Sequence, residues 1–321
     1  MIKVGVLGAR GRMGRQVCAT VEQAPDTELA AQVDEGDALD ALAGCDVVVD
    51  FTHPGVVMDN LRWCVDHGLN VAVGTSGFGD DRLAEVRSWT EKAPGARVLI
   101  VPNFSVGAVL MIRFAAQAAR FFESAEIIEL HHAAKADAPS GTALRTASEI
   151  GAARAKAGLG APPDATKQEL PGARGTTVED VHVHSVRLSG LVAHQEVLFG
   201  GHGETLTIRH DSLDRASFMP GVLLAIHGVP SLPPGLTVGI ESLLGLDLSL
   251  FPHSPPGALA RCLPSSLSRC APSLLRPGTG AHPIRCVTPL LYPYARGSPS
   301  FPTAPQRLSG EMAQELGEST D

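Results

Sequence analysis

A short segment near the middle of the chain gathers residue types that bind anions and transfer protons. Its members are His131, His132, Lys135, Ser140, Gly141 and Thr142. The serine is placed to cap a following helix, which would leave the next two backbone N–H groups free to bind an anion. Together with up to three cationic side chains, these groups predict a site for one or two carboxylates. Histidine also exchanges protons near neutral pH, so the segment predicts acid–base chemistry; the alternative is a surface loop with chance histidines.

A second segment, near the N-terminus, has the glycine spacing of a dinucleotide-binding loop. It consists of Gly8, Ala9, Arg10, Gly11, Arg12, Met13 and Gly14. Glycines at this spacing allow a tight turn and a close approach of the backbone to a pyrophosphate, which the helix N-terminus attracts. Asp34 is placed to accept hydrogen bonds from an adenosine ribose, which favours NADH. Arg10 and Arg12 could hold the 2′-phosphate of NADPH, so we expect both cofactors to bind; a glycine-rich turn with solvated arginines is the alternative.

The elements that would position the glycine loop alternate between strand and helix. Strand signals cover Ile2–Leu7, Glu28–Val33, Val47–Asp50, Asn70–Val73 and Arg97–Val101, and helix signals cover Arg12–Gln23, Val56–His67 and Asp80–Lys92. This alternation predicts an α/β fold with a doubly wound, Rossmann-type parallel sheet covered by helices on both faces.

Later elements follow a different pattern, with strands in succession. Helix signals cover Val106–Phe122 and Thr142–Ala157, strand signals cover Glu126–His131, Val181–Leu188, His194–Phe199 and Glu204–Arg209, and a Pro/Gly-rich loop covers Leu159–Gly175. They predict a second, α+β domain over residues 106–212. A helix at Arg215–Ile226 and a strand at Leu236–Val238 return to the first domain, which we expect to comprise residues 1–105 and 213–246.

Composition narrows the class of protein. Lys and Arg number 26 against 34 Asp and Glu, a net charge of −8, whereas nucleic-acid-binding proteins are usually basic. No apolar run approaches the roughly 18 residues of a membrane span, and the N-terminus has no signal-peptide pattern. The 6 cysteines include no Cys-x-x-Cys pair, which fits a reducing cytoplasm. We therefore expect a cytoplasmic protein with no nucleic-acid partner, no membrane partner and no metal.

The composition changes from about Asp247. The segment 247–321 holds half of the chain's 24 prolines, and no Asp, Glu or Lys occurs between positions 248 and 310. Prolines this frequent prevent a long helix or a central strand. The pattern predicts a disordered, Pro-rich extension; a small domain of unfamiliar pattern and a shifted reading frame of GC-rich DNA are the alternatives.

Several further motifs occur within residues 1–246. They are Asp50 to Pro54, Gly74 to Gly77, Val101 to Phe104, Glu129 to His132, Lys135 to Thr142, Leu188 to His194 and His210 to Arg215. With the glycine loop, they resemble the 4-hydroxy-tetrahydrodipicolinate reductase (dihydrodipicolinate reductase) family of the actinobacterial type. The pattern His-His-x-x-Lys-x-Asp-Ala-Pro-Ser-Gly-Thr is the most specific part of the resemblance.

The resemblance implies a role for each matching residue. On the cofactor side, Gly8 to Met13 would bind the pyrophosphate, Asp34 the ribose, and Gly74, Thr75, Ser76, Val101, Pro102, Asn103 and Phe104 the nicotinamide. On the substrate side, His131 matches the acid–base position and Lys135 the proton donor. His132, Ser140, Gly141 and Thr142 match the segment that holds a small dicarboxylate. NADH or NADPH would reduce 4-hydroxy-tetrahydrodipicolinate to tetrahydrodipicolinate, in lysine and diaminopimelate biosynthesis.

The resemblance also implies a homotetramer whose second domains pair through an open sheet. Ser76 and Val101 stand where family members often have Thr and Ala, and both changes keep the size or the hydroxyl roughly intact. His194, His202 and His210 are expected to be structural or interface residues. Two alternatives to the reductase stay open, a dehydrogenase of another small imino or amino acid and a non-catalytic dinucleotide-binding protein.

Overall fold

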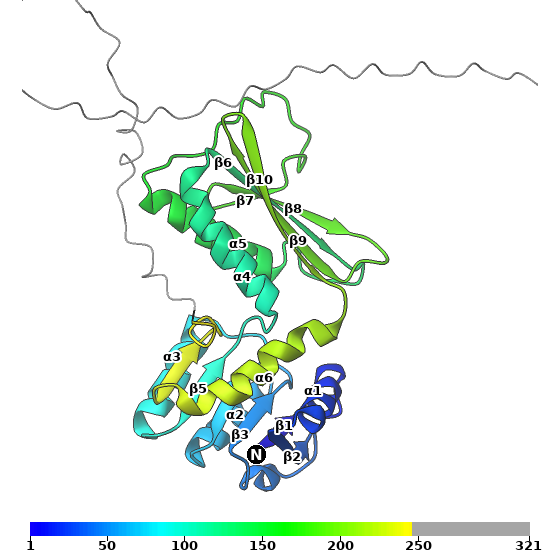
Figure 1. Ribbon diagram of the computed structural model, residues 1–321, viewed down its shortest axis with the longest axis vertical. Coiled ribbons are helices and arrows are strands. Elements are labelled where there is room, and N and C mark those ends of the chain that lie inside the picture. The colour runs from blue at the N-terminus through cyan, green and yellow to red at the C-terminus, as the bar shows by residue number, and fades with distance from the viewer. Residues whose placement is uncertain (246–321) are drawn as a thin grey trace, which may run out of the picture. The chain divides into compact units, whose positions relative to one another are not determined.

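Two β-sheets organise the chain (Figure 1). The structure is a computed structural model and describes residues 1–245. The segment 247–321, for which the sequence predicts a disordered extension, lies outside the described residues.

Sheet A is a parallel sheet of 6 strands in the order β11-β5-β4-β3-β1-β2. Its strands are β1 (Ile2–Leu7), β2 (Thr27–Val33), β3 (Val47–Asp50), β4 (Asn70–Val73), β5 (Arg97–Ile100) and β11 (Gly235–Val238). Because all of these strands run in the same direction, the loops that follow them meet at one edge of the sheet. The glycine loop and the segments at Gly74 and Val101 all begin at this edge.

Helices cover both faces of sheet A. They are α1 (Arg12–Gln23) and α6 (Met219–Gly228) on one face, and α2 (Val57–Asp66) and α3 (Asp80–Lys92) on the other. Strand β3 illustrates this arrangement, because Val47 and Val49 pack with α1 and α6, while Val48 packs with α2. A strand that is buried on both faces must be apolar at every position, which accounts for the Val-Val-Val run.

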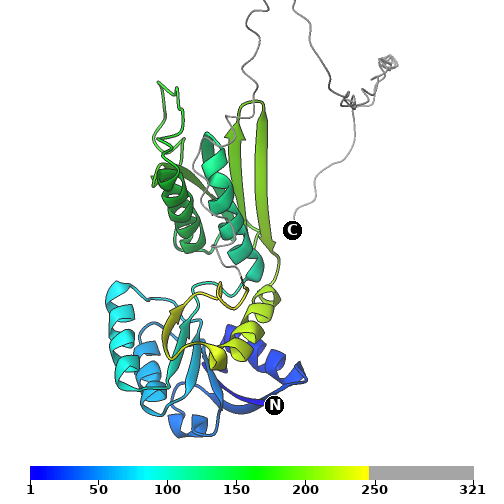
Figure 2. The ribbon, with the colours of Figure 1, turned by 60° about the vertical axis from the view of Figure 1, so that its left-hand side comes forward.

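Sheet B is a mixed sheet of 5 strands in the order β10-β9-β6-β8-β7. Its strands are β6 (Ser124–His131), β7 (Thr176–Val178), β8 (Val181–Arg187), β9 (Ala193–Gly201) and β10 (Glu204–Ser212). The β6–β8 pair is parallel, and the other pairs are antiparallel. Helices α4 (Val106–Ala118) and α5 (Gly141–Lys156) pack on one face through a core that includes Ile127 and Phe199. No other described element covers the opposite face (Figure 2).

The predicted fold class is confirmed, since a Rossmann-type parallel sheet is joined to a second α+β part. The chain passes from sheet A to sheet B after β5 and returns through α6 and β11, which pairs with β5. The domain boundaries near residues 105 and 213 stay a prediction. Within residues 1–245, no helix is long and apolar enough to cross a bilayer.

Most predicted elements occur within one or two residues of their expected bounds. Larger differences occur at α4, β7, β10 and α6, and β10 continues beyond the expected Arg209 to Ser212. Helix α4 ends at Ala118 and a 3-10 turn follows it, so β6 begins at Ser124. The helix expected from Arg215 starts as a 3-10 turn before α6. The sequence did not predict strand β7. Its turn to β8 consists of Glu179 and Asp180, with φ of 48° and 62°. This left-handed turn is normally marked by asparagine or glycine, so the sequence carried no signal for it.

Candidate active site

A cleft of about 340 Å³ opens where the loops of sheet A approach the ends of the strands of sheet B. It is lined by several residues that the sequence placed in the site: Met13, Gly74, Val101, Pro102, Asn103, Phe104, His131 and Thr142. The other predicted site residues do not line this cleft, namely Gly8, Ala9, Arg10, Gly11, Arg12, Asp34, Thr75, Ser76, His132, Lys135, Ser140 and Gly141. The cleft therefore brings the inner ends of the predicted cofactor and substrate segments together.

The glycine loop packs closely against the neighbouring backbone. Gly8 has φ +76°, and a Cβ there would lie 2.6 Å from the carbonyl oxygen of Phe51. A Cβ on Gly14 would collide with the carbonyl oxygen of Gly8, so the turn and the first helical turn can pack only with glycine at both positions. Helix α1 begins at Arg12 without a side-chain cap, which leaves backbone N–H groups available to an anion. These residues fit a dinucleotide phosphate.

Asp34 lies beside this loop with an ordered carboxylate. Its Oδ2 accepts a hydrogen bond from the N–H of Arg10 at 2.6 Å, and its Oδ1 accepts one from the N–H of Glu35 at 2.9 Å. These backbone bonds, that from Glu35 first, lower the pKa of Asp34. The guanidinium of Arg10 donates to Asp37 at 2.8 Å and to the carbonyl of Glu35 at 3.1 Å. Arg10 and Asp34 thus lie together, and Arg10 and Arg12 are both exposed.

Thr75 supports the site through a buried carboxylate. Its hydroxyl donates to Oδ1 of Asp50 at 2.7 Å, and Asp50 is completely buried. The N–H and hydroxyl of Thr52 donate to the same oxygen at 2.9 and 2.7 Å, and Asn60 donates to Oδ2 at 3.2 Å. This network fixes the ends of β3 and β4, where the loop with Gly74 begins.

Aromatic rings form one wall of the cleft. Phe51 and Phe104 lie with their centroids 5.3 Å apart, and a Cβ on Gly74 would collide with the Phe51 ring. Asn103 connects this wall to the substrate side, because its Nδ2 donates to Oγ1 of Thr142 at 3.3 Å. Its Oδ1 accepts from the N–H of Ser105 at 2.8 Å, which orients the amide.

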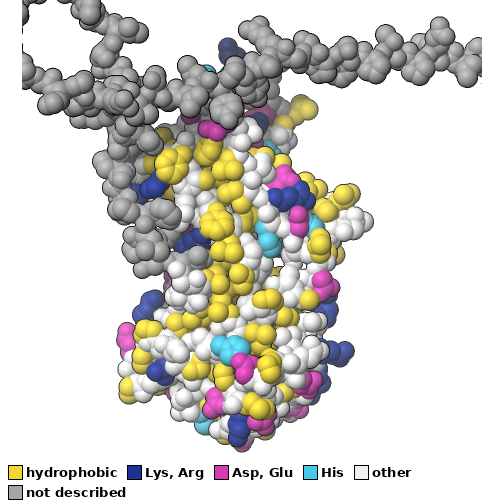
Figure 3. All heavy atoms as spheres, viewed as in Figure 1, with side chains coloured by type: hydrophobic (Ala, Val, Ile, Leu, Met, Phe, Trp, Pro, Cys, Tyr) yellow, Lys and Arg dark blue, Asp and Glu magenta, His cyan; other side chains and the backbone are white. Residues whose placement is uncertain are grey.

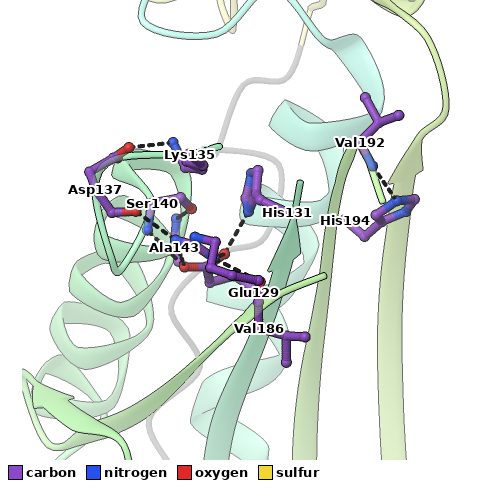
Figure 4. Close-up of polar contacts among 10 residues, drawn as sticks. Glu129, His131, Lys135, Asp137, Ser140, Ala143, Val186, Val192 and His194 are labelled. Carbon is purple, nitrogen blue, oxygen red and sulfur yellow. Dashed lines mark hydrogen bonds and ion pairs between the residues drawn. The ribbon is translucent and has the colours of Figure 1, made fainter. Parts of the chain in front are cut away.

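His131 ends β6 and contacts a buried carboxylate. Its Nδ1 lies 2.5 Å from Oε2 of Glu129, and its side chain is 13% exposed (Figure 4). Burial lowers the pKa of His131, and Lys135 and Arg187 lower it further, while Glu129 opposes them. Burial alone would raise the pKa of Glu129, but hydrogen bonds from Arg187, Ser185 and His131 outweigh it and lower the pKa. The imidazole is therefore neutral near pH 7 and remains able to take a proton.

Lys135 lies in the loop that follows β6. Its Nζ donates to Oδ1 of Asp137 at 2.7 Å, and its side chain is 21% exposed. The side chain of His132 is exposed in the same loop, and its backbone accepts from the N–H of Lys135 at 3.1 Å. The loop thus brings the Lys135 ammonium and the exposed His132 side chain into one segment.

The start of α5 has the geometry expected of an anion site. Ser140 is its N-cap, since its Oγ accepts from the N–H of Ala143 at 3.1 Å, and the serine is 2% exposed. The N–H groups of Gly141 and Thr142 have no hydrogen-bond partner among residues 1–245. Ser140 therefore shapes the site with its Oγ already engaged, and the next two N–H groups remain for a carboxylate.

Sheet B contributes residues to the cleft that the sequence did not place there. Nε2 of His194 accepts from the N–H of Val192 at 3.2 Å, so its Nδ1 carries a proton and donates to Oδ1 of Asp211 at 2.6 Å. His210 contacts Oγ of Ser105 at 3.1 Å. Both histidines line the cleft, in addition to any structural role.

Gln195 is a further unexpected residue of the cleft. Its Nε2 donates to Oγ1 of Thr146 at 2.8 Å, and its Oε1 is buried without a partner among the described residues. Strand pairing brings these residues to the cleft, because β9 pairs with β6 and β10 pairs with β9, so only a correct register could have found them.

Comparison with known proteins identifies the family. The profile for the N-terminus of dihydrodipicolinate reductase matches residues 2–104, and the profile for its C-terminus matches residues 107–244. The chain belongs to the dihydrodipicolinate reductase family. The recognition made from the sequence motifs is confirmed, as are the enzyme class, an oxidoreductase, and the nicotinamide cofactor.

Named relatives of this dihydrodipicolinate reductase family member are close in sequence. The 4-hydroxy-tetrahydrodipicolinate reductase of Thermobifida fusca (strain YX) is 66% identical over 246 residues, which cover 77% of this chain and 100% of that protein. The enzyme of the same name from Cutibacterium acnes (strain DSM 16379 / KPA171202) is 63% identical over 247 residues, 77% of this chain and 100% of that protein.

A solved structure of the family is similar in fold. The dipicolinate-bound dihydrodipicolinate reductase from Paenisporosarcina sp. TG-14 aligns with a TM-score of 0.67 at 36% identity, over 75% of this chain and 99% of that chain. The two-part architecture is therefore that of the family.

Proposed function

We propose that the chain reduces 4-hydroxy-tetrahydrodipicolinate to tetrahydrodipicolinate with NADH or NADPH, in the diaminopimelate route to lysine. The observation that carries the proposal is one cleft, in a member of this family, that joins the nicotinamide-side residues Val101 to Phe104 with His131 and Thr142. A non-catalytic dinucleotide-binding protein would not need an acid–base histidine at the inner end of that cleft.

The cofactor lies along sheet A in this proposal. The Gly8–Met13 loop and the start of α1 hold its pyrophosphate, and Asp34 accepts from the adenosine ribose. Gly74, Thr75 and Ser76 line the nicotinamide side, Thr75 through its backbone because its hydroxyl is engaged by Asp50. Reduced nicotinamide, when bound, supplies the hydride.

The substrate lies at the start of α5. A dianionic substrate needs cations and N–H donors, which the exposed His132, the Lys135 ammonium and the N–H groups of Gly141 and Thr142 provide. Ser140 keeps these N–H groups in place as the N-cap. The hydroxyl of Thr142 accepts from Asn103, so its own proton is free for a substrate oxygen.

The proton is delivered by Lys135 and His131. The 4-hydroxyl group of the substrate leaves as water, which gives a conjugated imine. Hydride addition to this imine leaves an enamine carbon that must be protonated, and a general acid nearby accelerates that step. The Lys135 ammonium is the donor, and the neutral imidazole of His131 accepts and passes on a proton at the inner end of the cleft.

We further propose that the chain assembles as a homotetramer in the cytoplasm. The face of sheet B opposite α4 and α5 carries half-buried apolar side chains: Ile128, Leu130, Val186 and Leu198. Hydrophobic side chains also gather in a band over the part of the molecule that carries α4 (Figure 3). Contiguous apolar surface of this kind is typical of a subunit interface. The three free, buried cysteines of the described residues, Cys18, Cys45 and Cys64, suit a reducing compartment.

The deciding experiment follows the oxidation of NADPH by the purified chain. We expect turnover that depends strictly on freshly prepared aspartate-semialdehyde condensation product, and His131→Ala and Lys135→Ala should each lower kcat by roughly 10²- to 10⁴-fold. His227→Ala on α6 and Lys92→Ala on α3 are matched controls that should leave kcat unchanged. Turnover of another imino acid, NADPH binding without turnover, or a wild-type kcat in either site variant would refute the proposal.

A further inference from the structure

Glu129 is a completely buried carboxylate that no role proposed above uses. Donors from three segments surround it: Nδ1 of His131 on β6 at 2.5 Å, the N–H of Ser140 before α5 at 3.1 Å, and, on β8, both guanidinium N–H₂ groups of Arg187 at 2.8 Å and the Ser185 side chain. A buried ion pair is weak evidence of a stabilising role, because apolar residues of similar volume often give equal stability. The position of Glu129 therefore calls for an explanation in function.

A carboxylate that is ionised can only accept hydrogen bonds. The contact at 2.5 Å therefore requires that Nδ1 of His131 carries a proton, which leaves Nε2 as the nitrogen free to react. Arg187 holds the carboxylate by two bonds to its two oxygens, so the carboxylate plane cannot rotate to offer another geometry.

The second oxygen of Glu129 extends this control to the substrate segment. Its Oε1 accepts from the N–H of Ser140, whose Oγ caps α5. Arg187 adds another restraint, because it donates to the carbonyl of Asp137 at 2.6 Å in the same loop. One carboxylate thus contacts both the acid–base imidazole and the residue before the free N–H groups of α5.

We propose that Glu129 is a positioning residue that fixes the Nδ1-protonated tautomer of His131 and holds its imidazole at a set place relative to the N-terminus of α5. The inference rests on the proposed function of His131. Bound substrate would then have its carboxylates on α5 and its reacting carbon near Nε2 in a single geometry. Small displacements of a reacting group are expensive in rate, so a shared anchor serves catalysis directly.

The test compares Glu129→Gln with Glu126→Gln in the full chain. Glu126 lies on the same strand as Glu129, but its side chain is on the opposite face of the sheet. It is paired with Arg174 and His184, so Glu126→Gln is a matched control that should keep wild-type kcat. Glutamine at 129 keeps one acceptor oxygen and places an NH₂ group among donors, so either His131 or the N–H of Ser140 loses its acceptor, and the negative charge beside the imidazole is removed. We expect kcat to fall roughly 10- to 100-fold, with the KM for NADPH unchanged.

The pH profile gives a readout that a purely structural role would not move. The titratable or charged groups that face His131 or share its cleft are Glu129 on β6, Arg187 on β8, Lys135 in the loop, His194 on β9 and His210 on β10. Of these, Glu129 is the carboxylate that favours the protonated imidazole. Loss of this carboxylate in Glu129→Gln should shift the limb of the pH profile of kcat/KM that reports the histidine to lower pH. The same limb should not shift in Glu126→Gln.

A double-mutant cycle separates this inference from the proposed function. If Glu129 acts through the imidazole, adding Glu129→Gln to His131→Ala should lower kcat no further. Equal losses with and without His131, or a wild-type kcat and pH limb in Glu129→Gln, would overturn the inference. A wild-type kcat in His131→Ala alone would instead overturn the proposed function. Should Glu129→Gln fail to fold, Glu129→Gln/Arg187→Met leaves no buried unpaired guanidinium and carries the same test.

Discussion

Thr75 offers a direct test of how the loops at the edge of sheet A are supported. Its hydroxyl is one of four hydrogen-bond donors to Asp50, which is completely buried. Thr75→Val keeps the shape of the side chain and removes this donor alone. A hydrogen bond to a charged group contributes about 1.5–3 kcal/mol, so we expect the free energy of unfolding to fall by that amount. For a chain of this size, the loss corresponds to a decrease of roughly 3–12 °C in Tm.

The assay is thermal or urea unfolding of the purified chain, together with the Kd of NADPH. Thr90→Val is the matched control, because Thr90 is also buried and its hydroxyl donates to the neutral carbonyl of Arg87 at 2.9 Å. The free energy of unfolding should fall less in this control, by about 0.5–1.5 kcal/mol. The Kd should change less than about threefold in Thr75→Val, or ~0.7 kcal/mol, because the hydroxyl points to Asp50. Equal stability of Thr75→Val and the wild type would refute the argument.

Three further outcomes are expected. Arg10→Ala should raise the KM for NADPH about tenfold, or ~1.4 kcal/mol, and that for NADH far less, because NADPH alone carries a 2′-phosphate; equal losses in steady-state kinetics would contradict the role of Arg10. Because the folded pKa of Glu129 is lowered, its stabilising contribution is fully present above the unfolded pKa of about 4.3 and is lost as the pH falls through the folded pKa. Urea unfolding at a series of acidic pH values should therefore show a shallower loss of stability in Glu129→Gln than in the wild type. Truncation after Leu246 should preserve kcat and Tm, because 246 residues of this chain match a relative over its whole length; a large loss of either would show that the remaining residues matter.

Two motifs could be predicted directly from the sequence, because their geometry depends only on neighbouring residues. The Gly8–Gly14 turn depends on contacts within a few residues, and the N-cap at Ser140 needs only the helix that follows it. The alternation of strand β6 also indicates that Glu129 is buried. Glu129 lies on the same face of the strand as Ala125 and Ile127, whose side chains are buried. A carboxylate at a buried position predicts a partner.

The partners themselves could not be predicted, because they come from distant parts of the chain. Arg187 reaches Glu129 from another strand, and Thr75 reaches Asp50 from the next loop of the sheet. His194 and His210 enter the cleft through the register of β9 and β10. A pattern of residue types sets which face of a strand is buried, whereas the identity of the neighbouring strand depends on the tertiary packing of the whole sheet.

The return of the chain to sheet A has a consequence for how the protein is made. Arg97 on β5 donates to the carbonyl of Leu232 at 2.7 Å, 135 residues later, and α6 covers Val47 and Val49 from the same late segment. At about 5–20 residues per second, a ribosome needs roughly 7–27 s to synthesise that interval. During this time the nascent sheet has an unpaired edge at β5 and an uncovered apolar face. The strands of sheet A that are synthesised first therefore remain exposed to aggregation until the last strand, β11, pairs with β5.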